Sequence, residues 1–127
     1  MIAPCKRPLH TIIPAMVMRD SLPVMPFGVM GGHYQGFGQP WVLSNMLDYG
    51  MSVQEAQDCA RMFVYQDKVT VERGIPVETV SRLAAMGHDV SVPDAPIGGS
   101  QGIWVDRKTG ILSAGSDPRK DGCALAF

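Results

Sequence analysis

The sequence has little net charge and no strongly basic segment. Its 127 residues carry 11 lysines and arginines against 12 aspartates and glutamates, which gives a formal net charge of −1 and a pI of about 6.2. Nucleic acids and anionic lipid surfaces attract proteins through concentrated positive charge. The composition therefore argues against nucleic acid as a partner.

The sequence also lacks the spacings that predict a disulfide framework or a metal centre. Its three cysteines, Cys5, Cys59 and Cys123, cannot all pair and form no C-x-x-C motif. The histidines are scattered, so no metal-ligand pattern is present. No apolar run approaches the ~18 residues of a membrane-spanning helix, and residues 1–7 lack the order of a secretory signal peptide. We therefore expect no metal, no cofactor and no membrane segment in a soluble chain of cytoplasm or periplasm.

What the sequence does contain is the composition of a folded globular domain. Hydrophobic residues make up 46% of the chain and charged residues 18%, which is typical of chains that bury a core and untypical of disordered ones. Since domains average about 150 residues, residues 1–127 are expected to form a single module.

The first part of the chain predicts a β-hairpin. Residues 9–19 are mostly apolar or β-forming, and Pro14 within them marks an edge position or an irregularity. The turn formers Arg19-Asp20-Ser21 separate this run from a second apolar run at residues 22–30. Both runs are nearly continuous in apolar residues, so we expect both faces of these strands to be covered.

Helical patterns follow a glycine-rich stretch. Residues 39–49 have helical spacing, with Val42 and Met46 on one stripe and Gly50 as a stop. Ser52 and Glu55 form a capping box at the start of a second helix. Three further features complete the helical part: Val53, Ala56, Ala60 and Phe63 on one face of the second helix, Pro76 at the start of a third helix, and Gly87 at its end.

The remaining segments predict short strands. They lie at residues 69–72, 88–92, 102–106 and 111–114, with a turn at 107–110 between the last two. The order is two strands, three helices interrupted by one short strand, and then more strands. That order predicts a layered α+β fold.

Gly31-Gly32, at the end of the second strand, is the first candidate site. Glycine carries no Cβ, so backbone N–H groups there can approach a substrate and stabilise an oxyanion. The alternative is a flexible connector, because glycine is common in loops. The residues alone leave both interpretations open.

Two further segments are candidates. His10-Thr11 follows Lys6-Arg7-Pro8, and a hydroxyl and an imidazole beside basic residues can hold a carboxylate; an ordinary strand residue and a surface histidine are the alternative. Residues 115–122 carry charges of opposite sign next to each other, which we interpret as a solvated turn with ion pairs. No segment contains a recognisable nucleophile motif.

Taken in order, these segments resemble the small subunit of γ-glutamyltransferases (γ-glutamyltranspeptidases) and their hydrolase relatives. The matching segments are Lys6-Arg7-Pro8-Leu9, Pro14-Ala15-Met16-Val17, Gly31-Gly32, Val42-Leu43-Ser44-Asn45, Asp48-Tyr49-Gly50, Val53-Gln54-Glu55-Ala56, Val71-Glu72-Arg73-Gly74 and Ser116-Asp117-Pro118-Arg119-Lys120-Asp121-Gly122. They are collinear over nearly the whole chain.

The resemblance implies a fold, an activity and site residues. It implies a portion of the αββα sandwich of N-terminal-nucleophile hydrolases, which cleave or transfer γ-glutamyl or related acyl amides. It implies that Gly31 and Gly32 supply backbone amides to the oxyanion hole. It also implies that His10 and Thr11 stand where well-known members carry two serines that contact the glutamyl α-carboxylate. Thr11 keeps a hydroxyl and His10 does not, which puts strict γ-glutamyl specificity in doubt.

The same resemblance implies that this chain is incomplete as an enzyme. The family's nucleophile is a threonine freed at the start of the small subunit, and that threonine should precede Met1. The expected partners are therefore the upstream large- and small-subunit segments of the same precursor, and the chain alone should be inactive. A stand-alone, non-catalytic binding module derived from this fold is the alternative. Because half of a sandwich leaves apolar surface uncovered, we expect the isolated chain to form homo-oligomers.

Overall fold

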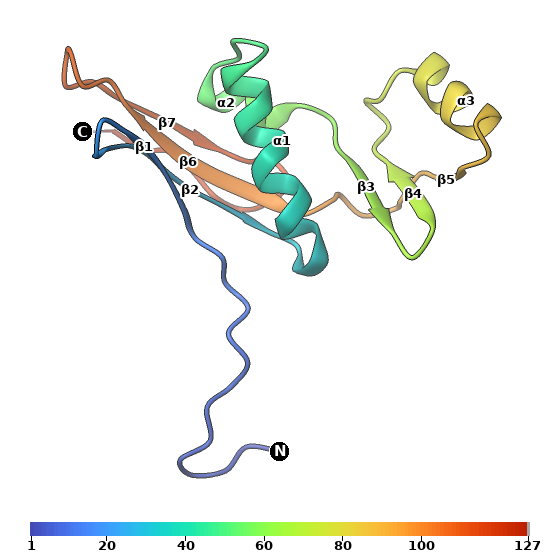
Figure 1. Cartoon of the computed structure of the whole chain (residues 1–127), viewed down its shortest axis with the longest axis horizontal. Coiled ribbons are helices and arrows are strands. Elements are labelled where there is room, and N and C mark those ends of the chain that lie inside the picture. The colour runs from blue at the N-terminus through green and yellow to red at the C-terminus, as the bar shows by residue number, and fades with distance from the viewer. Residues whose placement is uncertain (127) are drawn as a thin grey trace.

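The computed structural model describes residues 1–126, which form two sheets and three helices (Figure 1). The larger sheet is antiparallel throughout, with the order β1-β2-β6-β7. The smaller sheet has the order β3-β4-β5, and its β4–β5 pair is parallel. The strands are β1 (Ala15–Arg19), β2 (Leu22–Met30), β3 (Met62–Tyr65), β4 (Lys68–Val71), β5 (Asp89–Ser91), β6 (Gly99–Val105) and β7 (Leu112–Ser116). The helices are α1 (Gln35–Leu47), α2 (Val53–Asp58) and α3 (Val77–Ala85), with a 3-10 turn η1 (Gly32–Tyr34) before α1.

The core lies between the larger sheet and the helices α1 and α2, which cover one of its faces (Figure 1). From Met25 onward β2 alternates: Met25, Phe27 and Val29 are buried under the helices, and the residues between them are more exposed. The buried cluster consists of Met25, Phe27, Val29, Tyr34, Val42, Val53, Ala56 and Ile97. The layered α+β arrangement expected from the order of elements is therefore present.

The opposite face of the larger sheet is open in this chain. Strand register places four exposed, large apolar side chains on that face: Met16, Met30, Ile103 and Leu112. The expectation that both faces would be covered is wrong for the described residues. The continuous apolar pattern reflects a sheet whose second face needs a cover that residues 1–126 do not supply.

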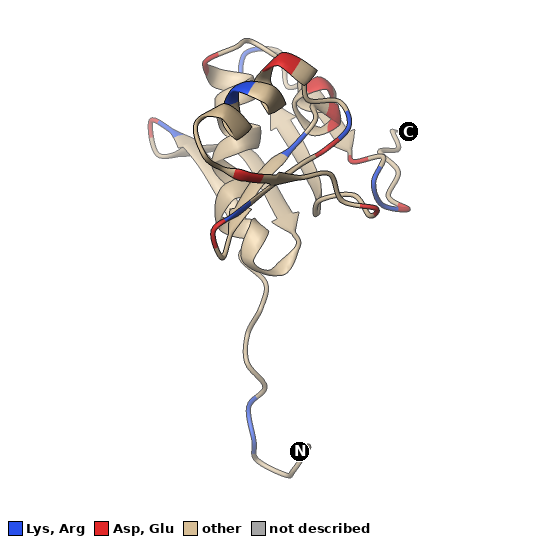
Figure 2. Cartoon of the chain, turned by 90° about the vertical axis from the view of Figure 1, so that its right-hand side faces the viewer, with Lys and Arg blue, Asp and Glu red and all other residues tan. Residues whose placement is uncertain are grey.

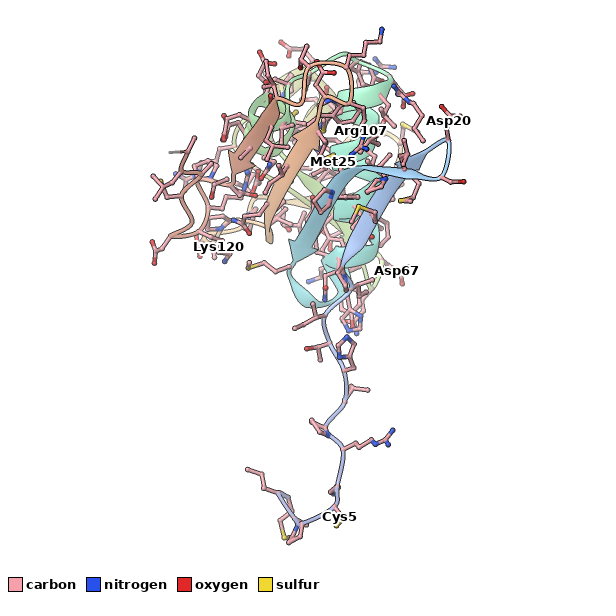
Figure 3. All side chains as sticks on the ribbon, turned by 90° about the vertical axis from the view of Figure 1, so that its left-hand side faces the viewer. Cys5, Asp20, Met25, Asp67, Arg107 and Lys120 are labelled. Atoms are coloured by element: carbon pink, nitrogen blue, oxygen red, sulfur yellow. The ribbon has the colours of Figure 1, made fainter. Side chains whose placement is uncertain are left out.

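The N-terminal hairpin is confirmed, but its first strand is shorter than expected. β1 pairs with β2 from Ala15 onward, while the preceding residues of the predicted strand at 9–19 pair with no strand. Proline has no N–H to donate to a ladder, and β1 begins directly after Pro14. The first part of the N-terminal segment extends away from the sheet, as the chain around Cys5 shows in Figure 3.

The helices differ from the prediction mainly at their ends. α1 begins at Gln35, inside the glycine-rich stretch, because Gly38 lets it approach β2: a Cβ there would lie 2.5 Å from a Val29 methyl carbon. The capping box of Ser52 and Glu55 is confirmed, with both reciprocal hydrogen bonds present. α2 ends at Asp58. The prediction that Ala60 and Phe63 lie on its face is therefore wrong.

The second sheet was only partly expected. β4 and β5 fall in predicted strand segments, but β3, where Phe63 lies, was missed. α3 follows Pro76 as predicted and has no buried residues, and it lies beside β5 at the edge of the chain (Figure 1). Lysines and arginines are interspersed with aspartates and glutamates around α2, α3 and the connecting loops (Figure 2).

Candidate functional site

A large hollow lies where the N-terminal segment meets the open face of the larger sheet. Its volume is about 810 Å³. Three parts of the chain line it: the extended segment at residues 11–14, the strands β2 and β6, and the turn that follows β2. Thr11, Gly31, Gly32 and Gln35 are among the lining residues. Two of the three predicted candidate segments are therefore in one cavity.

The turn at Gly31-Gly32 has a backbone that requires glycine. Gly31 has a φ of 132° and Gly32 a φ of 59°, a region that other residues rarely adopt. A Cβ on Gly31 would lie 2.9 Å from the Cα of Gly98, whereas a Cβ on Gly32 would meet no atom within 4 Å. Among the described residues, neither glycine N–H donates a hydrogen bond to another part of the chain. Two consecutive N–H groups are therefore unpaired beside open space.

Thr11 reaches the cavity because helix α1 holds its segment. The Gln35 Nε2 donates to the Thr11 carbonyl oxygen at 2.9 Å and to the Gly32 carbonyl oxygen at 3.3 Å. One turn later, the Gln39 Nε2 donates to the Ile13 carbonyl oxygen at 2.5 Å. His10, the other residue of the predicted carboxylate site, is exposed and does not line the cavity. The structure thus brings Thr11 and the glycine turn together, and leaves His10 outside.

A buried ionic network lies near the glycine turn. Arg61 and Asp117 form an ion pair, and both side chains are fully buried. Arg61 also donates to the Ile97 carbonyl oxygen at 2.8 Å and to the Ser100 hydroxyl at 2.9 Å. Burial opposes ionisation of Asp117, yet the hydrogen bond from the Arg119 N–H and the Arg61 charge together lower its pKa below the ordinary value.

A second ion pair extends this network. The Arg119 guanidinium donates to both carboxylate oxygens of Glu72, at 2.8 and 2.5 Å, and to Asp117 at 3.1 Å. Glu72 accepts from the backbone N–H of Ile97 at 2.9 Å and from that of Arg61 at the same distance. Burial raises the pKa of Glu72, but these hydrogen bonds outweigh it and the pKa is lowered on balance. The turn and ion pairs expected in residues 115–122 are present, and Lys120 and Asp121 are exposed, but the segment is not solvated throughout because Asp117 is fully buried.

The network is connected to the glycine turn through the loop at residues 97–100. Arg61 and Glu72 bind Ile97, and Asp117 accepts from the Ser100 N–H at 2.9 Å. Between these fixed points, Gly98 lies so close to the turn that a Cβ on it would be 2.5 Å from the Met30 carbonyl oxygen. The buried charges therefore fix a loop that packs directly against the turn.

Tyr34 makes a second connection between the network and the turn. Tyr34 is two residues after Gly32, and the Arg61 guanidinium carbon lies 5.6 Å from the centroid of its ring. Burial raises the pKa of Tyr34 to about 12, so the phenol stays protonated at neutral pH. The neighbouring His33 ring stacks on Tyr65 of β3 at 4.7 Å. The smaller sheet and the buried arginine therefore contact the residues that follow the glycine pair.

Sequence reasoning missed the two glutamines and the charged residues of the network. Gln35 and Gln39 have the i, i+4 spacing that places two side chains on one helix face. Arg61 is the only charged residue in an apolar run from Cys59 to Val64, and a lone charge in such a run indicates a buried, paired group. Its partner could not be identified, because Asp117 is 56 residues away.

The described residues contain no group of three or more histidine, cysteine, aspartate or glutamate side chains that could hold a metal ion. Within residues 1–126, no helix is long and apolar enough to cross a membrane. Cys5 and Cys123 are exposed, Cys59 is half-buried, and all three are free thiols.

One helix-covered sheet with an apolar open face is half of an αββα sandwich, the architecture of N-terminal-nucleophile hydrolases. Two solved structures of this class match. The cephalosporin acylase from Bacillus halodurans superposes with a TM-score of 0.87 at 38% identity, over 99% of this chain and 24% of that one. The gamma-glutamyltranspeptidase from Pseudomonas nitroreducens, complexed with L-DON, superposes with a TM-score of 0.83 at 27% identity, over 99% of this chain and 67% of that one.

The chain belongs to the gamma-glutamyltranspeptidase family, whose sequence model matches residues 1–127. The glutathione hydrolase-like YwrD proenzyme of Bacillus subtilis (strain 168) is 35% identical over 135 residues, which cover 99% of this chain and 26% of that proenzyme. The chain thus spans about a quarter of the length of the curated relatives that it matches. The predicted family and fold class are confirmed.

Proposed function

We propose that this chain supplies the oxyanion-binding turn and part of the substrate carboxylate site of an enzyme that cleaves or transfers γ-glutamyl or related acyl amides. The observation that carries this proposal is the pair of unpaired N–H groups at Gly31 and Gly32, beside the cavity that Thr11 also lines. The relatives named as a glutathione hydrolase-like proenzyme and a cephalosporin acylase support amide cleavage and leave the acyl group open.

In the proposed mechanism, a threonine from an upstream segment attacks the carbonyl carbon of the amide. Its own α-amino group accepts the hydroxyl proton, and the carbonyl oxygen becomes an oxyanion that accepts hydrogen bonds from the Gly31 and Gly32 N–H groups. The C–N bond then breaks, the proton passes to the leaving amine, and the acyl group stays on the threonine until water or another amine removes it. Each oxyanion donor contributes ~3 kcal/mol of transition-state stabilisation.

Thr11 is the proposed contact for a carboxylate of the substrate. Its hydroxyl can donate one hydrogen bond, and its segment borders the same cavity as the glycine turn. We also assign His10 to this carboxylate, although it is exposed and outside the cavity lining. Contact between His10 and the substrate would need the cover that residues 1–126 do not supply.

The proposal is tested with a chromogenic γ-glutamyl anilide. The isolated chain should release no chromophore, and the precursor that joins it to its in-frame upstream segment should release it. In that precursor, Gly32→Ala should lower kcat by about 100-fold, because a side chain disfavours the positive φ that aims the N–H groups. Gly36→Ala is the matched control, since it lies in α1 with a helical backbone and open space around its Cα.

Two outcomes would contradict the proposal. Turnover by the isolated chain would show that the nucleophile lies within residues 1–127. An upstream coding sequence without an autocleavage threonine would favour the alternative, a binding module that kept the fold without the chemistry.

A further inference from the structure

A single side chain connects the two halves of the proposed site. Gln35 is the first residue of α1, and its Nε2 binds the carbonyl oxygens of both Thr11 and Gly32. Thr11 is 24 residues away in sequence, and Gln35 is only 9% exposed. We propose that Gln35 is a positioning residue that keeps the Thr11 segment and the glycine turn in one fixed arrangement. This inference rests on the proposed function of that site.

The chemistry of the two acceptors requires an amide at this position. Both partners are carbonyl oxygens, which only accept hydrogen bonds, and a neutral side-chain amide offers two N–H donors on one nitrogen. A glutamate would offer none and would place a negative charge against two carbonyl dipoles. The orientation of the amide is thereby determined, with its nitrogen toward the backbone.

The Thr11 segment needs such a contact because it belongs to no sheet. The ladder of β1 begins only at Ala15, and Leu9 and Ile12 are 88% and 68% exposed. Fixing the backbone of a free residue costs ~1–2 kcal/mol of conformational entropy. Hydrogen bonds from a rigid helix offset that cost and hold the Thr11 hydroxyl at a constant distance from the turn.

Gln39 can serve as a comparison for Gln35, which both holds the Thr11 segment and binds the glycine turn. It binds the Ile13 carbonyl oxygen and so holds the same segment, but it forms no hydrogen bond to the glycine turn among the described residues. Loss of Gln39 should loosen only the carboxylate contact. Loss of the Gln35 amide should loosen that contact and also remove one of two hydrogen bonds to the Gly32 carbonyl oxygen, leaving only the one from the Gln35 backbone N–H. The peptide neighbours of this carbonyl carry the oxyanion donors, so the turn should become less rigid.

The test compares Gln35→Met with Gln39→Met in the precursor, since methionine keeps the length and volume of glutamine and removes the donor. Gln35→Met should raise KM and lower kcat, for a loss of about 10- to 100-fold in kcat/KM, because small displacements in a catalytic site have effects of this size. Gln39→Met should raise KM less than about 10-fold, as expected for one hydrogen bond, and leave kcat unchanged. Equal effects of the two variants on kcat would overturn the inference.

A second measurement does not depend on activity. A protease that cuts before branched apolar residues can cleave at Ile12 and Ile13 only when the carbonyl groups of this segment are released. Brief native proteolysis should therefore cut Gln35→Met at these bonds at least about 10-fold faster than the unsubstituted protein. If the unsubstituted precursor turns over no amide and Gln35→Met is still cut faster, the proposed function fails and the positioning role stands. Equal cleavage rates would overturn the positioning role.

Discussion

At the scale of single residues, Arg61 and Asp117 form a fully buried ion pair of this chain. Both side chains are fully buried, and a buried ion loses its hydration, so each depends on the other and on the surrounding hydrogen bonds. Removing one partner leaves an uncompensated charge in a site that cannot hydrate it. Replacing both partners would remove the charge altogether.

We therefore predict that Asp117→Asn lowers the free energy of unfolding at pH 7 by about 3–5 kcal/mol. The pKa of Asp117 in the folded chain lies below its ordinary value of 3.8, so its ionised form contributes stability at any pH above that value. The contribution disappears as pH falls through the folded pKa. The difference between Asp117→Asn and the unsubstituted chain should hence shrink below about pH 4, as measured by urea unfolding across pH.

Asp121→Asn is the matched control, because it removes the same charge from an exposed residue nearby. It should change the free energy of unfolding by less than about 0.5 kcal/mol. A similar loss for both variants would show that the overall charge, and not the buried pair, is responsible.

At this scale, the sequence was sufficient to identify residues whose role depends only on their neighbours in the chain. Gly31 and Gly32 could be selected because a glycine pair at the end of a strand has a backbone consequence of its own. Gln35, Arg61 and Asp117 could not, because their significance lies in partners 24 to 56 residues away. No spacing rule reaches that far.

At the scale of elements, the loop at residues 97–100 connects the buried charged residues to the glycine turn. Its ends are bound by Arg61, Glu72 and Asp117, and Gly98 packs against the Met30 carbonyl oxygen and the Tyr34 ring. Met30 is the last residue of β2, and Gly31 follows it. A displacement of this loop must therefore displace the turn.

Gly98→Ala should lower the kcat of the precursor by at least about 10-fold, since the added Cβ would lie 2.5 Å from the Met30 carbonyl oxygen and push the turn out of position. Gly110→Ala is the control that introduces similar backbone strain without the steric clash. Gly110 has a φ of +77°, close to the +64° of Gly98, and a Cβ there meets no atom within 4 Å. The control should lose about 1 kcal/mol of stability and keep its kcat, so equal losses of kcat would contradict the role of the loop.

Elements were predictable where local rules decide them. β2 and the capping box of α2 depend on neighbouring residues, and both are as predicted. The first strand was predicted too long, because its residues are β-formers but Pro14 and the two glutamines of α1 hold them outside the sheet. β3 was missed because Ala60 and Phe63 continue the helical spacing of α2, which predicted a longer helix than the structure has.

At the scale of the whole molecule, the open face of the larger sheet is the dominant feature. Met16, Met30, Ile103 and Leu112 are each more than 40% exposed on that face, and contiguous apolar surface of this kind drives association. In the αββα sandwich of the family, the other large sheet, which is not the β3-β4-β5 sheet of this chain, would cover this face. Without that cover, a second copy of the chain is the available apolar partner.

The isolated chain is accordingly predicted to form dimers or larger oligomers at micromolar concentration. Met16→Glu with Ile103→Glu should shift the population toward monomer, because both charges lie on the open face. Val77→Glu on α3 adds a charge at an exposed apolar position away from that face, and should leave the association unchanged. Light scattering across a concentration series measures both. A monomeric unsubstituted chain at high concentration would contradict this prediction.

The sequence by itself determined the family, the α+β class, the hairpin, the helix start at Ser52 and the glycine pair. Each of these follows from residues close together in the chain or from a collinear set of motifs. Only the tertiary structure decided that Thr11 meets the glycine turn, that His10 does not line the same cavity, and that Asp117 is buried. Those outcomes depend on hydrogen bonds and ion pairs between distant segments, whose free energy is realised only when the layers have packed.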